Sequence, residues 1–428
     1  MLAQHVERTK ADTAQMLARE FVTLLSKEEF TAAVKRFDPT VSAALPPARL
    51  EGVWKSLLTQ VGPLKRQLGT RTEVAQGYDV VFVSCEFDKS PLDIKVVFND
   101  SKEIAGLFFV PTPPRLETPA PSASENSTER EVLIGEGQWV LHGTLSLPNA
   151  SGQLPAVVLV HGSGPNDRDE TIGPNKPFRD LAQGLTARGI AVLRYEKRTR
   201  EHAAQLAPLK DSITVKEETI DDALFAVSLL RGADRVDPKK VFILGHSLGG
   251  MLLPRIGILD SNVAGLIVMA GSSRALEDVI LDQVTYLFSL DGAMSEEKKA
   301  QLDAIKLQVA RVKEPTLSSA TPSSELPLGI PAKYWLDLRG YNPAEFAKGL
   351  KVPILVLQGE RDYQTTMEDF AAWRQRLSSK SNATFKSYPK LNHLFIEGEG
   401  RSTPSEYNVS GHVAPEVIKD IAAWIKGK

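Results

Sequence analysis

The sequence predicts an α/β protein whose larger part is a doubly wound, mostly parallel sheet, preceded by a small α+β unit. Beyond about residue 139, short apolar runs alternate with segments of helical periodicity, which is typical of parallel strands joined by crossover helices. Before residue 112, helical periodicity is followed by extended segments. The 428 residues also exceed one average domain, so the chain can bury more than one hydrophobic core.

The predicted N-terminal unit, residues 1–112, begins with one-sided helices. Apolar residues recur at steps of three and four around Leu17 and Phe21, again around Val34, and again around Trp54. Extended segments follow at 78–87, 92–99 and 104–111. Because this unit has no dense cluster of catalytic residue types, we interpret it as a binding or assembly module, with a homodimer as one expectation.

A linker is predicted at residues 113–130, where prolines are followed by Ser, Asn and Glu without an apolar period. The catalytic domain is predicted at 131–428, with strands at 139–148, 156–160, 190–195, 241–245, 265–270, 353–359 and 383–389. Helical patterns lie between them, at 176–188, 216–232, 248–259, 366–379 and 414–427. The interval of about 274–350 is far longer than one crossover helix needs, which predicts a helical cap inserted over the mouth of the sheet.

Composition excludes several classes of protein. Fifty-one basic residues nearly balance 53 acidic ones, so the chain offers no basic field to nucleic acid. Cys85 is the single cysteine and allows no intrachain disulfide. The charged first twenty residues do not match a signal peptide, and no run reaches the roughly 20 apolar residues of a membrane span. We expect a soluble protein, either cytoplasmic, or periplasmic or secreted with its leader removed.

The motif GHSLGG follows the apolar run VFIL and precedes the helical run MLLPRIGIL. Gly245-x-Ser247-x-Gly249 at such a strand-to-helix junction predicts a nucleophile elbow. The serine backbone must adopt a sparsely populated conformation, and small neighbours let the strand and the helix approach each other. The turn also places the next amides at a helix N-terminus, where developing negative charge is stabilised. We therefore expect Ser247 to be a nucleophile.

A serine hydroxyl needs a base to remove its proton and a carboxylate to orient that base. In a doubly wound sheet with this elbow, the acid and the histidine follow the serine on loops after late strands. Asp362 lies just beyond PILVLQG, and His393 just beyond ATFKSYP. The alternatives that stay open are His412 for the base and, for the acid, Glu360, Glu277 and Asp278.

Two backbone N–H groups should stabilise the negative charge on the carbonyl oxygen during attack. The N–H of Leu248, directly after the nucleophile, is one expected donor. The loop HGSGPNDRDE follows an early strand, and Gly162 and Gly164 allow its backbone to curl inward. The N–H of Ser163 is therefore the second expected donor of this oxyanion hole.

Other residues on these loops are expected to border the substrate pocket, namely His161, Gly162, His246, Arg168 and Lys197. Arg168, Lys197 or Arg198 would suit a substrate carboxylate or phosphate, but the nearby acids favour ion pairs that brace the loops. No H-E-x-x-H motif or cysteine pair occurs, and the G-x-G at 162–164 lacks the third glycine of a dinucleotide site. We expect neither a metal nor a cofactor.

The motifs VLVHGSGPNDRDETIGPNKPFRDLA, GHSLGG, LQGERDYQ and LNHLF together resemble bacterial α/β-hydrolases of the serine esterase type, dienelactone-hydrolase-like or prolyl-aminopeptidase-like. The resemblance covers residues 131–428 and implies a triad of Ser247, Asp362 and His393, with Ser163 and Leu248 as oxyanion donors. A dienelactone hydrolase normally has cysteine as its nucleophile, where this chain has serine. Residues 10–112 resemble the small domain of unknown function that often precedes such hydrolases, a SnoaL-like α+β cone.

The expected function is that of a carboxylesterase, which cleaves small to medium carboxylic esters through an acyl-enzyme. A peptidase or an acyl thioesterase that uses the same triad is the alternative. A non-catalytic binding protein on the same fold is a remote alternative, because it would require a broken triad. The natural substrate and its acyl length are not predicted.

Overall fold

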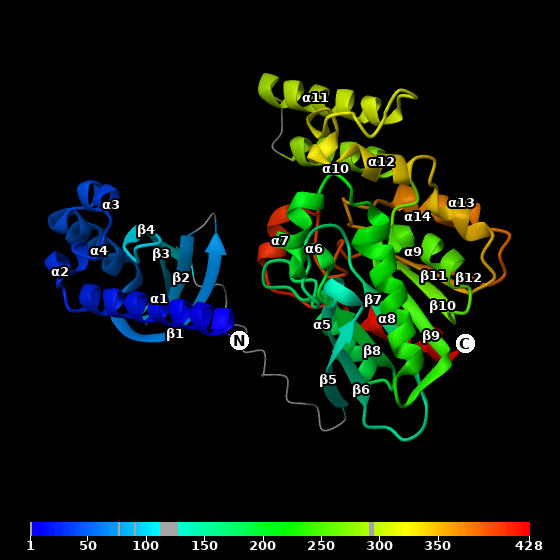
Figure 1. Ribbon diagram of the computed structural model, residues 1–428, viewed down its shortest axis with the longest axis horizontal. Helices are drawn as coiled ribbons and strands as arrows, with labels where there is room; N and C mark the ends of the chain where they lie inside the picture. Colours follow the sequence, from blue (N-terminus) through cyan, green and yellow to red (C-terminus); the bar gives the residue numbers. More distant parts are fainter. Residues whose placement is uncertain (1, 76–77, 90, 112–126, 291–294) are drawn as a thin grey trace. The chain divides into compact units, whose positions relative to one another are not determined.

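The computed structural model describes residues 2–75, 78–89, 91–111, 127–290 and 295–428 (Figure 1). The chain divides into two compact units, Met1–Thr118 and Pro119–Lys428. Most of the predicted linker lies outside the described residues. Its last residues, from Ser127 onward, already belong to a strand of the larger unit, which therefore begins before the predicted residue 131.

The N-terminal unit packs helices against one antiparallel sheet. The helices are α1 (Leu2–Ser26), α2 (Phe30–Val34), α3 (Pro39–Ala44) and α4 (Pro47–Val61). The sheet has the order β1 (Leu64–Ala75), β2 (Tyr78–Phe87), β3 (Pro91–Phe98) and β4 (Ile104–Pro111). Phe21 and Trp54 from the helices meet Val83, Cys85 and Ile94 from the strands in a core of its own. The predicted α+β class is confirmed.

The larger unit contains an eight-stranded sheet with the order β12-β11-β10-β9-β7-β8-β6-β5. Strands β7 to β12 are parallel to one another, and β6 pairs antiparallel with both β5 and β8. The bounds are β5 (Ser127–Ile134), β6 (Leu141–Pro148), β7 (Leu154–Val160), β8 (Ala191–Tyr195), β9 (Val236–His246), β10 (Gly265–Met269), β11 (Ile354–Gly359) and β12 (Ala383–Tyr388). The predicted doubly wound, mostly parallel sheet is confirmed.

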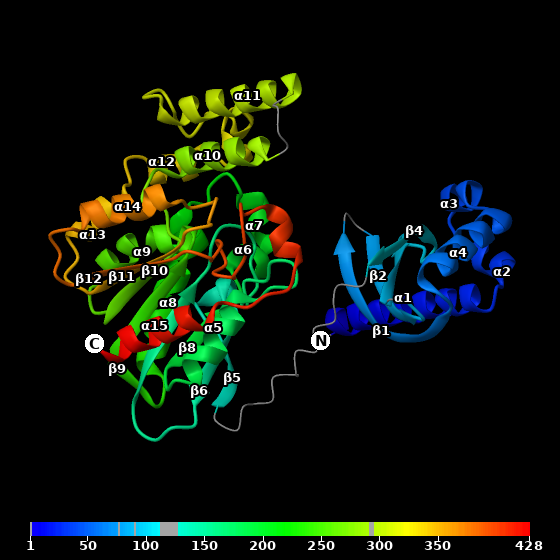
Figure 2. The same cartoon turned by 180° about the vertical axis from the view of Figure 1, so that it is seen from behind.

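Helices cover both faces of this sheet (Figures 1 and 2). One face packs against α5 (Pro177–Thr186) and α15 (Pro415–Lys426). The other packs against α8 (Asp221–Gly232), α9 (Leu248–Leu259), α13 (Pro343–Lys348) and α14 (Met367–Arg376). Within β7, Val157 and Leu159 face the first layer, whereas Val158 and Val160 face the second. Because both faces are buried, the strand is a continuous apolar run.

The interval between β10 and β11 contains additional helices, α10 (Leu276–Ser289), α11 (Glu296–Lys313) and α12 (Ala332–Leu338), before α13 returns to the sheet. Ile280, Val312, Leu326 and Trp335 form a separate hydrophobic cluster within this insertion. Figures 1 and 2 show α10, α11 and α12 stacked beyond one end of the sheet. We call this segment the cap.

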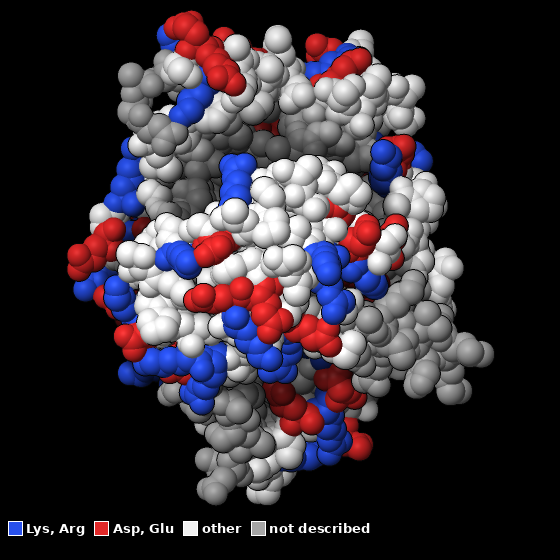
Figure 3. Space-filling view, turned by 90° about the vertical axis from the view of Figure 1, so that its left-hand side faces the viewer, with Lys and Arg blue, Asp and Glu red and all other residues white. Residues whose placement is uncertain are grey.

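The surface carries charges of both signs. On the face shown in Figure 3, lysine and arginine side chains are interspersed with aspartate and glutamate side chains. This agrees with the near balance of 51 basic and 53 acidic residues. No helix in the described part of the chain is long and apolar enough to cross a membrane.

Candidate active site

Ser247 occupies the junction between β9 and α9. Its φ of 53° and ψ of −117° lie in a region that residues other than glycine rarely adopt, which indicates backbone strain at this position. A Cβ on Gly245 would lie 2.4 Å from the backbone carbon of Gly249, and a Cβ on Gly249 would lie 2.4 Å from the carbonyl oxygen of Val160. Glycine is therefore required at both positions for the strained turn to form against β7.

Asp362 and His393 meet on the loops that follow β11 and β12. The Nδ1 atom of His393 lies 2.7 Å from Oδ2 of Asp362, and both side chains are buried. The other oxygen of Asp362 accepts the N–H groups of Gln364 and Thr365, at 2.7 and 3.0 Å. Gln358 Nε2 donates to Oδ2 at 3.1 Å. These donors hold the carboxylate in one orientation toward the imidazole.

The imidazole of His393 lies directly beside the elbow. Its ring centroid is 4.7 Å from that of His246, the residue before Ser247. The Nε2–H of His246 donates to the backbone carbonyl of His393 at 3.0 Å. The structure thus brings the predicted nucleophile, base and acid to one edge of the sheet.

Three of the four alternatives, His412, Glu360 and Asp278, pair with other residues. His412 Nδ1 pairs with Asp180 at 3.0 Å and its side chain is exposed. Ser387 donates to Glu360. Glu277 and Asp278 lie in the first turn of α10, in the cap.

The loop after β7 passes directly beside the nucleophile. A Cβ on Gly162 would lie 3.1 Å from the Cβ of Ser247, so glycine permits this approach. The Gly162 N–H donates to Glu170 Oε1 at 2.6 Å. The Gly162 carbonyl accepts from Lys197 Nζ at 2.7 Å and from Asn166 Nδ2 at 3.2 Å. Both the N–H and the C=O group of Gly162 therefore form hydrogen bonds with side chains of the protein.

The two expected oxyanion donors each follow one of the two residues that approach here, Ser163 after Gly162 and Leu248 after Ser247. Leu248 is the first residue of α9, so its N–H belongs to the helix N-terminus that normally lacks a helical partner. Within the part of the chain that the structure describes, neither the Leu248 N–H nor the Ser163 N–H donates to a protein acceptor. Both groups are thus available to a ligand oxygen.

His246 forms a buried ion pair with Glu170, whose Oε2 lies 2.9 Å from Nδ1 of the imidazole. Burial opposes a positive charge, but the Glu170 carboxylate outweighs burial and raises the pKa of His246. Burial alone would raise the pKa of Glu170. The positive charge of His246 outweighs burial, so the pKa of Glu170 is lowered. Glu170 consequently connects the loop at Gly162 with the residue before the nucleophile.

His161 is buried between the rings of Phe178 and Tyr195, with centroids 5.2 and 5.1 Å away. Its Nε2 lies 3.1 Å from the carbonyl oxygen of Asp167. Burial lowers the pKa of His161 to about 4. The imidazole is therefore neutral at pH 7 and packs as part of the core behind the loop.

The two predicted pocket cations are bound by carboxylates of the chain. Arg168 donates to Glu196 at 2.8 Å and to Glu131 at 2.7 Å. Lys197, whose side chain is 2% exposed, lies 2.6 Å from Glu218 Oε1. Neither cation is a free anion-binding group. Arg198 likewise pairs with Asp222, at 3.0 Å between Nε and Oδ2.

A cavity of about 410 Å³ opens beside the loop after β7. Its walls come from that loop, from the segment 199–213, and from the start of α12 in the cap. The surface is mainly apolar, with Glu218 as its buried acid. The lining residues are Ser163, Gly164, Thr199, Ala203, Leu206, Ala207, Lys210, Ile213, Glu218, Ile330, Pro331 and Tyr334. Among the described residues, no group of three or more His, Cys, Asp or Glu side chains is arranged to hold a metal.

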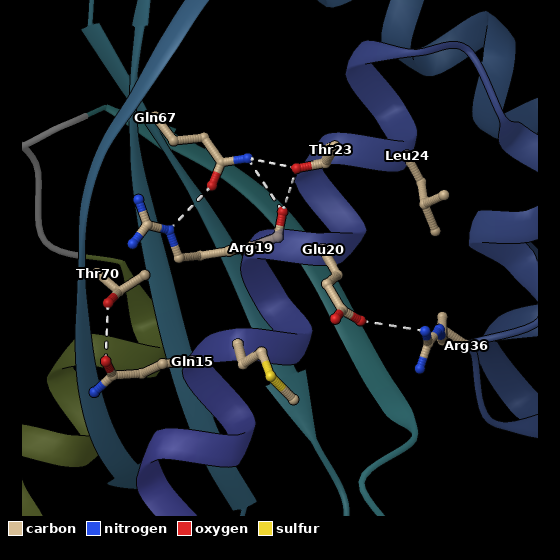
Figure 4. Close-up of a pocket in the computed structure, with 9 residues that line it drawn as sticks. Gln15, Arg19, Glu20, Thr23, Leu24, Arg36, Gln67 and Thr70 are labelled. Atoms are coloured by element: carbon tan, nitrogen blue, oxygen red, sulfur yellow. Dashed lines mark hydrogen bonds and ion pairs between the residues drawn. The ribbon is translucent and has the colours of Figure 1, made fainter.

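The N-terminal unit has a separate cavity of about 830 Å³ between α1 and β1 (Figure 4). Gln67 of β1 donates to the carbonyl of Arg19 at 3.1 Å and to the hydroxyl of Thr23 at 3.0 Å. Arg36 pairs with Glu20 at 3.3 Å across its rim. The polar side chains of this cavity are therefore bound mainly to one another.

Residues 157–407 match the model of the Alpha/beta hydrolase family, and residues 18–107 match "Protein of unknown function (DUF3887)". The chain is 40% identical over 406 residues to Esterase EstD of Thermotoga maritima, covering 95% of this chain and 93% of that protein. Among solved structures, it is similar to Est1E from Butyrivibrio proteoclasticus, with a TM-score of 0.44 and 14% identity over 70% of this chain and 99% of that one. A Mycobacterium tuberculosis puromycin-hydrolyzing peptidase gives a TM-score of 0.46 and 17% identity over 85% of this chain and 49% of that one.

The family model covers more than half of the chain, and its residues include the elbow, the loop after β7 and the loops of Asp362 and His393. Esterase EstD aligns with both units of the chain rather than with the larger unit alone. This chain belongs to the alpha/beta hydrolase family.

Proposed function

We propose that this chain is a serine esterase that cleaves carboxylic esters through an acyl-enzyme, with Ser247 as nucleophile, His393 as base and Asp362 as orienting acid. The observation that carries the proposal is the buried Asp362–His393 hydrogen bond beside the strained Ser247 elbow. The 40% identity to Esterase EstD over nearly the whole chain supports ester hydrolysis as the reaction.

In the first half of the reaction, Ser247 Oγ bonds to the ester carbonyl carbon while its proton moves to Nε2 of His393. Asp362 accepts the hydrogen bond from Nδ1 and stabilises the imidazolium that forms. The carbonyl oxygen becomes an oxyanion and accepts from the N–H groups of Ser163 and Leu248. When the tetrahedral intermediate collapses, the carbon–oxygen bond to the alcohol breaks and His393 returns the proton to that oxygen.

In the second half, water attacks the acyl-enzyme and gives one proton to His393. The same two N–H groups stabilise the second oxyanion. Collapse releases the carboxylic acid, and Ser247 regains its proton from His393. The apolar cavity beside Ser163 is the place that we assign to the organic part of the ester, because Ser163, one of the two proposed oxyanion donors, lines it.

The Ser247→Ala variant tests the assignment. We expect purified wild-type protein to hydrolyse short-chain p-nitrophenyl esters and to be labelled covalently at Ser247 by a fluorophosphonate, and the variant to do neither. A matched panel of an ester, an acyl thioester and an aminoacyl amide at equal concentration compares the reaction types. Full esterase activity in Ser247→Ala would contradict the mechanism, and faster cleavage of the amide would identify a peptidase instead.

A further inference from the structure

The peptide group between Gly162 and Ser163 joins two features of the site. In a trans peptide the C=O and the N–H lie in one plane and point in opposite directions, and the described residues contain no cis peptide bond. The direction of the Gly162 carbonyl therefore sets the direction of the Ser163 N–H. Whatever holds the carbonyl also aims the N–H that we assign to the oxyanion hole.

Lys197 and Asn166 both donate to this carbonyl, and Lys197 is the charged donor at the shorter distance. Its Nζ lies 2.7 Å from the oxygen of Gly162, and the side chain is almost completely buried. We propose that Lys197 is a positioning residue of the oxyanion hole, which acts on the reaction through the Gly162–Ser163 peptide. This inference rests on the proposed esterase function. It adds a residue that never touches the substrate but determines how well the oxyanion is bound.

The physical reason is the freedom of a glycine loop. Without a side chain, Gly162 lets the adjoining peptide rotate at little cost. A rotated peptide would point its carbonyl oxygen, a negative dipole, toward the oxyanion. An ammonium on the carbonyl side favours the productive orientation, because rotation would break a charge-assisted hydrogen bond in a buried site. The same charge polarises the peptide and makes the Ser163 N–H a stronger donor.

Lys197 is itself held from two directions. Glu218 Oε1 lies 2.6 Å from Nζ, and the hydroxyl of Tyr334, on helix α12 of the cap, donates to Glu218 Oε2 at 2.8 Å. The Lys197 N–H donates to the carbonyl of Asn166, whose side chain also donates to Gly162. Glu218 lies in a π-helical turn, Lys216–Ile220, a local irregularity that is frequent at functional sites.

A buried ion pair such as Lys197–Glu218 is weak evidence for a contribution to stability. Removing two charges from water is costly, and apolar residues of similar size often stabilise a core as well as a buried ion pair does. The adjacent pair of Arg198 and Asp222 is also buried but is not among the contacts of Gly162. Variants of the two ion pairs can therefore be compared. An effect on stability is expected for either pair, whereas an effect on the oxyanion hole is expected only for Lys197–Glu218.

The test compares an ester with its thionoester, in which sulfur replaces the carbonyl oxygen. Sulfur accepts hydrogen bonds weakly, so only the oxygen ester gains fully from the N–H donors. For Lys197→Met, we expect kcat for the ester to fall by about 10- to 100-fold with little change in KM. This decrease is smaller than the one expected when an oxyanion-hole donor is removed completely. The ester-to-thionoester ratio of kcat/KM should fall by a similar factor, after active sites are counted with a fluorophosphonate.

Two variants make the result interpretable. Arg198→Met removes the other buried cation, and we expect it to lower stability but to leave the ratio unchanged. Lys197→Met/Glu218→Gln removes the carboxylate that would remain unpaired, so that a folded protein is available if the single variant unfolds. An unchanged ratio in both Lys197 variants would overturn the positioning role. Absence of ester hydrolysis and of labelling in the wild type would instead overturn the esterase function itself.

Discussion

At the scale of the residue, Asp362 owes its role to the donors around it. Two backbone N–H groups bind one carboxylate oxygen, and His393 and Gln358 bind the other. A carboxylate held in this way keeps the imidazole in the tautomer with a proton on Nδ1, so that Nε2 can accept the proton of Ser247.

The Asp362→Asn variant should therefore retain its fold and lose most of its activity. The amide oxygen can still accept the two backbone N–H groups, but the amide nitrogen would donate to Nδ1 and stabilise the wrong tautomer of His393. We expect kcat for a p-nitrophenyl ester to fall by about 10³–10⁴-fold, with an unfolding midpoint close to that of the wild type. Activity within tenfold of the wild type would mean that another acid orients the base.

His161 provides a prediction about pH. Its pKa is about 4 in the folded chain because of burial, against about 6.5 in an unfolded chain. As pH falls from 6.5 to 4, His161 binds a proton in the unfolded chain but stays neutral in the folded chain. The free energy of unfolding therefore decreases by about 3 kcal/mol. Well above pH 6.5 the imidazole is neutral in both states, and the effect disappears.

The His161→Gln variant removes this titration. Urea unfolding at pH 7.5 and at pH 4.5 should show a smaller drop in the free energy of unfolding for the variant than for the wild type. The comparison of the two drops cancels the other groups that titrate in this range, including the pair of His246 and Glu170. Equal drops in the two proteins would show that His161 titrates normally in the folded state.

The sequence predicts some contacts of the site much better than others. Ser247 and Asp362 each follow an apolar strand, and His393 follows the amphipathic strand ATFKSY. The order of the strands therefore places all three at one sheet edge, where the structure brings Asp362 and His393 into contact. Glu170 and Glu218 carry no such signal. Each is one acid in a polar stretch, and its partner is determined by how loops fold over one another.

At the scale of the element, the strands that the sequence did not predict share one property. β1 and β5 are edge strands, at one end of the four-stranded and the eight-stranded sheet respectively. Their sequences, LKRQLGTRTEVA and STEREVLI, are rich in charge. Charged edges discourage pairing with other chains, and they also remove the apolar pattern by which a strand is predicted. The buried strands, in contrast, were predicted because their apolar runs are continuous.

The elbow makes a prediction about stability. In Gly249→Ala, the new Cβ would lie 2.4 Å from the carbonyl oxygen of Val160 and 2.6 Å from that of His161. Both are backbone atoms of β7 and the loop after it, so α9 would have to move away from the sheet. We expect a loss of more than about 3 kcal/mol in the free energy of unfolding, at the upper end of single substitutions.

Gly232→Ala is the matched control. Gly232 ends α8, and a Cβ there would contact nothing within 4 Å. Alanine should be neutral or should stabilise the helix by up to about 1 kcal/mol. Urea unfolding of both variants measures the difference. Similar stability of the two would contradict the close approach between α9 and β7.

At the scale of the whole molecule, the chain forms two units with separate hydrophobic cores. Among the described residues, the buried core of the N-terminal unit ends at Ile104, with Leu107 and Phe109 packed against it, and the buried clusters of the larger unit begin at Ile134, with Val132 packed against them. Every group in the proposed mechanism lies in the larger unit. The polar side chains of the N-terminal cavity are bound mainly to one another.

Deletion of the N-terminal unit should therefore separate assembly from catalysis. A protein that starts at Ser127 keeps β5 and the whole eight-stranded sheet, and a unit with its own core can fold alone. We expect cooperative unfolding and a kcat/KM for a short p-nitrophenyl ester within about threefold of the full chain. If the N-terminal unit joins two copies, light scattering will give a dimer for the full chain and a monomer for the truncated one. Loss of activity in a truncated protein that remains folded would instead give the N-terminal unit a direct part in substrate binding.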